Sequence, residues 1–230
     1  MTIEQKLDVL NRIYGIYDAF ASGLEVACHK YCADCCTPNV SLTTLEGYRL
    51  VRGLEPARRE TLGRCLAQAS SQRFFRPLLT TNRIAALCRA GQEIPEEAFG
   101  AADKHCLLLE ENACPVYPLR PFGCRCFFSR VPCGAAGSAA MPEFVLTVNT
   151  VFLQMIEHLD AGGCTGNLAD VLLCLLSDEN RQAYRKGRLA CGASRLIGNH
   201  RLTVLMVPPE HRRRLRPILD ALGNLTIDPS

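Results

Sequence analysis

The spacing of apolar residues along the chain predicts a mostly helical protein. Apolar side chains recur at every third or fourth position from residue 3 to about residue 27, which predicts an amphipathic opening helix. The same spacing over residues 143–159 predicts the most regular helix of the sequence, and Gly162 and Gly163 end it.

Capping residues locate several of the other helices. Thr43, followed by Glu46 three residues later, forms a capping-box pattern that opens a helix through Leu54. Pro56 fits the first turn of a following helix, because its missing N–H has no helical partner there. Gly91 ends another helix. By similar signals we expect helices over residues 56–70, 76–90, 168–176, 178–190 and 208–222, and a strand over residues 202–207.

Residues 94–140 show little regular structure beyond a turn near residues 96–99. Pro115, Pro118 and Pro121 predict that no helix forms across this stretch, because proline removes a backbone donor and clashes with the preceding turn. A loop of this length needs something to hold it. We therefore expect one domain over residues 1–230. It would be mostly α, with a cysteine-rich metal-binding region over 28–128 held by metal and a helical remainder over 142–223.

Composition changes this picture mainly through the cysteines. The 230 residues are 48% apolar and 21% charged, so a core can form without cross-links. A net charge of +3 is too small to argue for a nucleic-acid partner, and no run of 18 apolar residues predicts a membrane span. The first residues lack the pattern of a secretory signal, so we expect a cytoplasmic protein. In that compartment 14 cysteines favour metal ligation, and a disulfide framework remains the alternative for a chain that has lost an export leader.

Eight of the cysteines form two dense clusters. In the first, Cys28, Cys32 and Cys35 would share one helix face if the opening helix continued that far. Thiolates are soft ligands that suit iron–sulfur clusters, zinc or copper(I), and eight are too many for one ion. We therefore expect two ions or a polynuclear centre. The predicted metal ligands are Cys28, Cys32, Cys35, Cys36, Cys106, Cys114, Cys124 and Cys126.

Basic residues close to the second cluster could offset the charge of the thiolates. Arg120 and Arg125, with Lys104 and Arg130, lie near these cysteines in sequence, and their donors could bond to sulfur. We expect Tyr117, Arg120 and Arg125 to lie beside the ligands.

The remaining candidates have less specific interpretations. His29 and His105 flank cluster cysteines and are interpreted as solvated loop residues, and residues 211–216 as a solvated basic helix face. Three cysteines within helical patterns are expected in the core, and three beside glycines are left open between extra ligands and reactive thiols. The first set is Cys65, Cys88 and Cys174, and the second is Cys133, Cys164 and Cys191.

The second cluster carries a family resemblance. It reads Cys106-Leu-Leu-Leu, then Cys114-Pro-Val-Tyr-Pro-Leu-Arg120-Pro-Phe-Gly-Cys124-Arg-Cys126-Phe. Together with the paired cysteines that end the first cluster, it resembles the cysteine-cluster family described as a zinc- or iron-chelating domain. The resemblance covers about residues 28–128 and implies metal binding, without a defined biochemical activity. The chain departs from the pattern in its first gap, in Ala33 and in the added Cys126.

These patterns leave three hypotheses and one rival. The first is a cytosolic protein that holds an iron–sulfur or iron centre with a redox, sensing or catalytic role. The second is a zinc-stapled protein that presents a surface to a protein partner, and the third is a metal-dependent enzyme that modifies a protein side chain. Cys28-x₃-Cys32-x₂-Cys35 also fits the radical S-adenosylmethionine pattern, but the chain lacks the alternating strands of the barrel that such enzymes use. No phosphate-binding loop, nucleophile elbow or HExxH motif is present, so enzymatic activity is left undecided.

Overall fold

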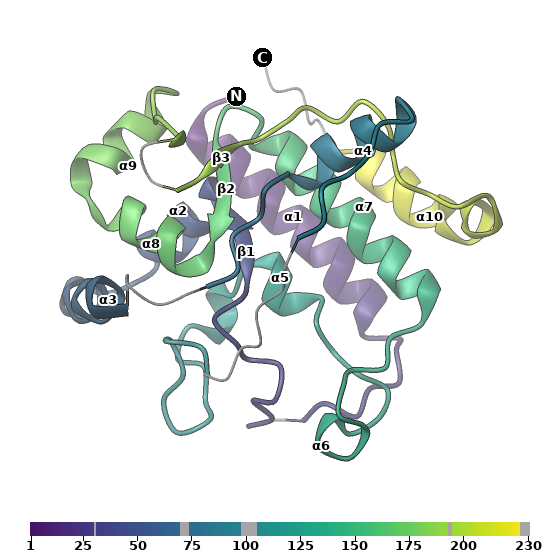
Figure 1. The fold of residues 1–230 in the computed structure, drawn as a ribbon, viewed down its shortest axis with the longest axis horizontal. Coiled ribbons are helices and arrows are strands. Elements are labelled where there is room, and N and C mark those ends of the chain that lie inside the picture. Colours follow the sequence, from purple (N-terminus) through teal and green to yellow (C-terminus); the bar gives the residue numbers. More distant parts are fainter. Residues whose placement is uncertain (30, 70–73, 98–104, 193–194, 226–230) are drawn as a thin grey trace.

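The computed structural model describes residues 1–29, 31–69, 74–97, 105–192 and 195–225, and the described chain is mostly helical, as predicted. Three helices lie side by side on the right of Figure 1, and a second group lies on the left. The first set is α1 (Ile3–Ala21), α7 (Glu143–Leu159) and α10 (Arg212–Gly223). The second is α2 (Thr44–Arg52), α3 (Pro56–Ala69), α8 (Leu168–Leu176) and α9 (Asp178–Arg185), while α4 (Thr81–Arg89) packs on α7. No helix among the described residues is long and apolar enough to cross a bilayer.

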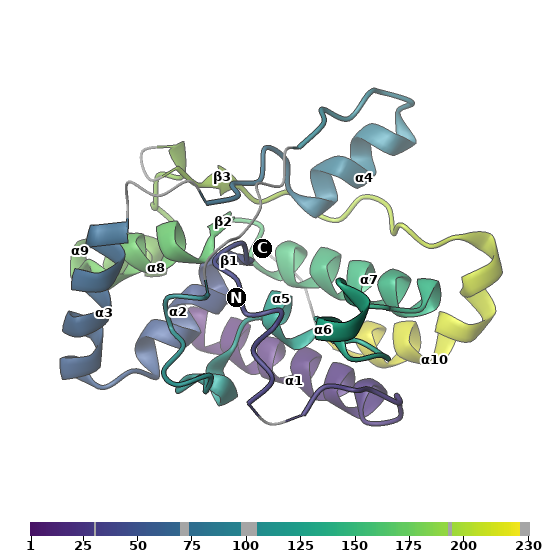
Figure 2. The ribbon, with the colours of Figure 1, turned by 60° about the horizontal axis from the view of Figure 1, so that its bottom comes forward.

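A small antiparallel sheet lies between the two helix groups (Figure 2). Its order is β1 (Ser41–Thr43), β2 (Cys164–Asn167) and β3 (Ile197–Gly198), with Leu42 opposite Gly166. The sequence did not predict this sheet, because each strand is too short to show alternation. The predicted strand at residues 202–207 is wrong. Side chains from α7 bond this stretch instead, with Gln154 accepting from Met206 N at 2.9 Å and donating to Val204 O at 2.8 Å.

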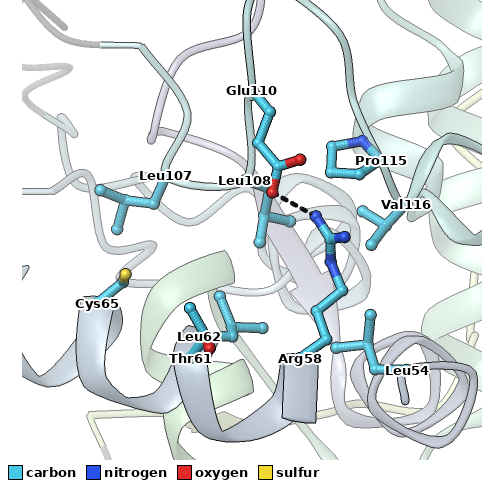
Figure 3. Close-up of a pocket in the computed structure, with 10 residues that line it drawn as sticks. All are labelled: Leu54, Arg58, Thr61, Leu62, Cys65, Leu107, Leu108, Glu110, Pro115 and Val116. Carbon is cyan, nitrogen blue, oxygen red and sulfur yellow. Dashed lines mark hydrogen bonds and ion pairs between the residues drawn. The ribbon is translucent and has the colours of Figure 1, made fainter.

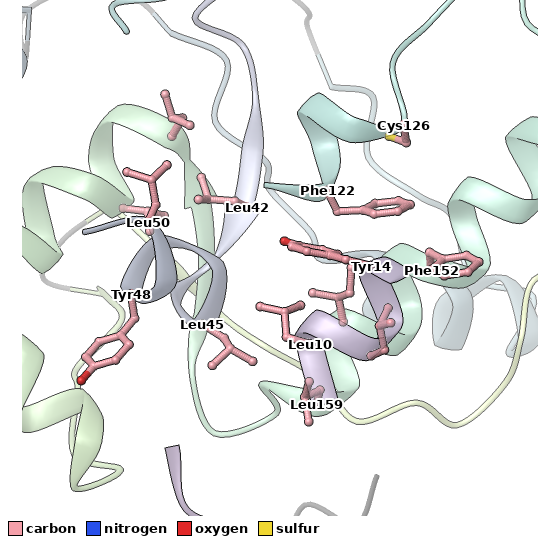
Figure 4. Close-up of a cluster of buried hydrophobic side chains, with 14 of the residues drawn as sticks. Leu10, Tyr14, Leu42, Leu45, Tyr48, Leu50, Phe122, Cys126, Phe152 and Leu159 are labelled. Atoms are coloured by element: carbon pink, nitrogen blue, oxygen red, sulfur yellow. The ribbon is translucent and has the colours of Figure 1, made fainter. Parts of the chain in front are cut away.

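The core contains an aromatic cluster that joins α1, α7 and the cysteine-rich loop, which is the segment of residues 105–140. The ring of Tyr17 lies edge-on to Phe122 at 4.7 Å and to Phe152 at 5.1 Å, and Phe122 and Phe152 stack with centroids 5.6 Å apart. Figure 4 shows Phe122 entering this core from the loop side, opposite Phe152 of α7. The cysteine-rich loop is therefore part of the main core through the ring of Phe122, and Val116, Cys126 and Phe128 belong to the same buried cluster.

Capping signals located most helix starts correctly. The capping box of Thr43 and Glu46 opens α2, Pro56 begins α3, and Asn167 caps α8 through Ala169 N at 2.9 Å. Gly91 follows α4 with φ of +64°, the left-handed conformation that glycine tolerates. α7 has the predicted bounds, whereas α4 and α9 are shorter than expected.

Two predictions about helices were wrong. α1 ends at Ala21, where the Ser22 hydroxyl bonds Ala19 O at 2.8 Å, so Cys28, Cys32 and Cys35 do not share a helix face. The prolines of the loop start short helices rather than prevent them, because the first turn of a helix tolerates proline. These helices are η1 (Tyr117–Leu119), α5 (Phe122–Arg125) and α6 (Cys133–Ala136), and η3 (Pro209–His211) likewise precedes α10. The turn predicted near residues 96–99 extends outside the described residues.

Buried carboxylates at the C-terminal end of α7 hold the irregular segments around it. Glu157 accepts from the backbone N–H groups of Asn82 and His200, both at 2.7 Å. Asp160 is fully buried and accepts from the hydroxyls of Thr44 and Tyr184, both at 2.7 Å. Because the amides and hydroxyls have acceptors on a rigid helix, their burial costs little.

Asp160 predicts a pH-dependent stability. Burial raises the pKa of its carboxyl from 3.8 to about 6, against the hydrogen bonds that favour the charged form. Between these values the folded chain holds the proton more tightly than the unfolded chain, so stability is lost as pH rises through this window. We expect the free energy of unfolding of the natural chain, measured against Asp160→Asn, to fall by up to about 3 kcal/mol between about pH 4 and pH 7.

Denaturant unfolding at a series of pH values measures this difference. Asp220→Asn is the matched control, because Asp220 is an exposed aspartate on α10. A difference between the natural chain and Asp160→Asn that stays constant with pH would contradict the assignment.

Candidate metal centre

The two cysteine clusters lie next to each other in one irregular layer, at the bottom of Figure 1. The backbone N–H of Cys106 donates to Cys36 O at 2.7 Å, which joins the two clusters directly. A third segment joins them: Ser129 N donates to the Cys28 sulfur at 3.3 Å, and Ala27 N donates to Ser129 O at 2.8 Å. Segments some 70 to 100 residues apart are thus held together by hydrogen bonds from backbone N–H groups to carbonyl oxygens and to a cysteine sulfur.

The first thiol group contains a cysteine that the sequence left undecided. The pKa of Cys28 is raised mainly by burial, and further by the neighbouring thiols of Cys32, Cys35 and Cys133. The start of α6 lies against this segment, since a Cβ built on Gly134 would be 4.0 Å from a carboxylate oxygen of Asp34. Cys133 therefore belongs with the first group. The sequence around Cys133 shows only a proline before a short helix, and this pattern does not indicate contact with the distant Cys28 segment.

The second thiol group consists of Cys36, Cys106, Cys114 and Cys124. Burial is the main cause that raises the pKa of Cys124, and the thiols of Cys106 and Cys114 raise it further. The pKa of Cys36 is lowered, first by a hydrogen bond from the Cys35 thiol, and the same bond is the largest cause that raises the pKa of Cys35. The adjacent pair thus links the two groups through the hydrogen bond from Cys35 to Cys36.

Cys126 lies on the core side of the second group, and its thiol is among the neighbours that raise the pKa of Cys124. Its side chain is 8% exposed and belongs to the hydrophobic core (Figure 4). The thiol donates to Gly123 O at 3.7 Å, and burial raises its pKa to about 12. This environment is that of a small apolar residue in the core.

Arg120 supplies a positive charge beside the second group. Its guanidinium lies 3.9 Å from the centre of the Tyr117 ring, and its charge opposes the rise in the pKa of Cys114 and Cys124. The Arg120 Nε is buried and has no hydrogen-bond partner among the described residues. A buried donor of this kind, next to thiols, would be satisfied by a thiolate sulfur.

Arg125 has a different position from the one expected. It pairs with Asp18 of α1 at 3.0 Å and donates to the carbonyl oxygens of Pro118 at 3.1 Å and Arg120 at 3.2 Å. Its donors therefore bond to oxygen and fasten the loop to α1. Arg130 is exposed, and Lys104 lies outside the described residues.

One buried carboxylate sets the position of the second group. Glu46 accepts from Phe122 N at 2.7 Å, from the Tyr14 hydroxyl at 2.8 Å and from Thr43 N at 2.8 Å. It therefore holds the start of α5, which carries Cys124, against α1 and α2. The sequence identified Glu46 only as the second half of a capping box. Its bond to Phe122 depends on tertiary structure.

The other cysteines divide into three kinds. Cys164 and Cys191, which the sequence left open, form a disulfide with Cα atoms 5.7 Å apart that joins β2 to the segment before β3. Cys174 is buried, as predicted. Cys65 and Cys88 are exposed, so their prediction as core residues is wrong, because α3 and α4 each bury a different, narrow set of side chains.

The donor set suits a soft metal, although the thiols do not converge on one point. Among the described histidine, cysteine, aspartate and glutamate residues, no three lie close enough to hold one ion together. Side-chain rotation within each group is therefore required for binding. His29 and His105 are exposed, which agrees with their interpretation as solvated loop residues. The fit therefore rests on the soft chemistry of the free thiols in this layer and on the unpaired nitrogen of Arg120.

Comparison of the chain with family models, with curated proteins and with solved structures gives no match. The resemblance to the cysteine-cluster family therefore stays a prediction from the motif.

Replacing Glu46 tests whether this carboxylate positions the loop. In Glu46→Gln an amide NH₂ faces either the Phe122 or the Thr43 N–H, so one buried donor loses its acceptor. We expect a loss of about 3 kcal/mol in the free energy of unfolding, together with faster alkylation of Cys124. Glu60→Gln, the same change at an exposed site on α3, should leave both unchanged. Equal stability of the two variants would show that Glu46 does not anchor the loop.

Proposed function

We propose that this chain is a metal-binding protein that holds an iron–sulfur or iron centre through its two thiol groups. The observation that supports it best is the hydrogen bond from Cys106 N to Cys36 O at 2.7 Å, which brings the two cysteine clusters into one layer. Packed free thiols with no metal would be open to oxidation, so their gathering favours a metal ligand role.

Each of the two thiol groups would supply four cysteine ligands to a separate centre. Cys28, Cys32, Cys35 and Cys133 would hold one centre. Cys36, Cys106, Cys114 and Cys124 would hold the other, and Cys126 is omitted because it lies in the core. An iron–sulfur centre would supply one-electron redox chemistry. The chain would supply the sulfur ligands and a fixed loop, and Arg120 would supply a donor and a positive charge beside the second group.

A zinc protein is the second candidate, and the structure of the loop favours it in one respect. Between residues 105 and 140 the described helices are only three or four residues long. Zinc bound by four thiolates would staple such a segment to the helices and leave a surface for a protein partner. Enzymatic modification of a protein side chain is a third possibility for either metal. Cytoplasmic location remains a prediction from the sequence.

The metal itself is the first test. The full chain, purified without oxygen, should be brown with charge-transfer absorbance and should contain iron and acid-labile sulfide. Colourless protein with stoichiometric zinc would overturn the iron proposal in favour of the zinc staple. Protein with neither metal, after supply of both, would overturn metal binding altogether.

Serine variants then test the division into two groups. Cys32→Ser and Cys124→Ser should each lose roughly half of the bound metal and should lower the stability of the fold, because metal binding and folding share free energy at such sites. Cys126→Ser and Cys65→Ser should keep full metal content, since the first thiol lies in the core and the second on the surface of α3. Full metal content in Cys32→Ser and Cys124→Ser would refute the assignment.

Arg120 tests the second group separately. Arg120→Gln removes a charge and a donor beside the thiols, so metal affinity there should fall about 10-fold or more. Arg120→Lys keeps the charge and should recover part of this loss. Competition with a chelator measures both, and equal affinities in all three proteins would exclude a role for Arg120.

A further inference from the structure

All of the net charge of the chain lies at its C-terminal end. Residues 1–194 contain 20 basic and 20 acidic residues, so their charges cancel. Residues 195–230 contain six arginines and three acidic residues, which gives the whole net charge of +3. Four of these arginines lie within the first five residues of α10, which are residues 212–216. The small charge of the whole chain therefore conceals a strongly basic segment.

The basic segment lies at the end of α10 where positive charge is least favourable. The N-terminus of a helix carries a partial positive charge, so cations in the first turn destabilise the helix. The first turn of α10 contains no acidic residue, and no side chain caps it. In contrast, α9 begins with Asp178 and Glu179. Departures from helix stability of this kind are typical of functional sites, where the charge serves a partner.

No carboxylate of the chain compensates this charge. Other exposed arginines have acidic partners, as Arg58 has in Glu110 at 2.6 Å (Figure 3). Among the residues that the structure describes, no ion pair involves three exposed arginines of α10. We call these three the arginine face: Arg212, Arg213 and Arg216. Their guanidinium donors are open to an anion from outside the chain.

The packing of α10 places the arginine face on the outside of the molecule. Leu215 and Leu222 are 0% and 1% exposed and mark the side of the helix that faces the core. Because a helix turns by about 100° per residue, the arginine face occupies an arc of about 100° on the exposed side. Arg214 lies at the flank, with its guanidinium 3.9 Å from the centre of the Phe144 ring. Figure 1 shows the start of α10 at the right-hand edge of the molecule.

The surroundings of the arginine face favour one kind of polyanion. None of the exposed large apolar side chains lies in the described residues 195–225. A helix that binds a membrane needs an apolar face to insert, and a protein interface needs an apolar centre. The same residues include no Phe, Tyr or Trp that could stack on an unpaired base. The phosphate backbone of a duplex needs neither, because arginine binds it by charge and hydrogen bonds.

We propose that the arginine face binds the phosphate backbone of a nucleic-acid duplex without reading its sequence. Each guanidinium donates to phosphate oxygens, and the three together neutralise about three phosphates. Asp220, one turn beyond Arg216 on the same exposed side, repels the duplex and limits the contact to the start of α10. No residue of the arginine face belongs to a thiol group, so the inference does not rest on the metal proposal.

The salt dependence of binding tests the contact directly. Fluorescence anisotropy of a labelled DNA duplex and of a labelled RNA duplex, each titrated with the full chain, gives the association constant at a series of KCl concentrations. Its logarithm should fall linearly with the logarithm of the KCl concentration, with a slope of about −3, because the bound arginines release counterions from the duplex. Absence of binding to both duplexes at low salt, or a slope near zero, would overturn the proposal.

Variants then locate the contact on α10. Each single change of the arginine face to glutamine (Arg212→Gln, Arg213→Gln or Arg216→Gln) should bring the slope about one unit closer to zero. Arg64→Gln, at an exposed arginine of α3, is the matched control and should leave the slope unchanged. Asp220→Asn should tighten binding, because it removes a charge of the same sign as the phosphates. Equal effects of Arg64→Gln and Arg216→Gln would overturn the assignment to α10.

Other polyanions provide the remaining controls. Tighter binding to phosphatidylserine vesicles than to either duplex would overturn the proposal in favour of a membrane surface. Tighter binding to a single-stranded oligonucleotide would overturn the assignment to a duplex. Iron and zinc content and the midpoint of denaturant unfolding, measured on the same samples, separate loss of this contact from loss of metal or of the fold.

Discussion

The hydrogen bond from Phe122 N to Glu46 is the contact on which the rest of the cysteine-rich layer depends. It connects α5, whose Phe122 side chain is fully buried in the main core, to a carboxylate on α2. The same carboxylate accepts from Tyr14 of α1. Beside this bond the Phe122 ring packs on Tyr17 and Phe152. A polar contact fixes the orientation of the loop and an apolar contact stabilises it, so the positions of the thiols follow from both.

Buried carboxylates also hold irregular segments around the C-terminal end of α7. α7 is the helix whose bounds were easiest to predict, and it is also the helix that carries buried acceptors. Glu157 and Asp160 bind backbone and side-chain donors from segments that have no regular structure of their own. A helix predicted from its apolar face thus supports irregular segments through its polar residues, and the apolar pattern alone could not show this.

Local signals explain which parts of the structure the sequence could predict. The capping box at Thr43, the cap at Asn167 and the glycine at 91 each act within a few residues, so the helix ends that they mark were predicted correctly. The three short strands and the exposure of Cys65 depend on contacts between distant segments. In the candidate site, the two clusters were visible as spacing, whereas the place of Cys133 and the burial of Cys126 required the fold.

The disulfide between Cys164 and Cys191 has a kinetic consequence for a chain that also carries free thiols. Cys164 is fully buried, so an attacking thiolate can reach only the sulfur of Cys191. The departing thiolate would then form inside the core, where it is poorly solvated and leaves slowly. Exchange with glutathione, or scrambling with the cluster thiols, is therefore obstructed. One chain can keep an oxidised sulfur pair and a reduced set of sulfurs at the same time.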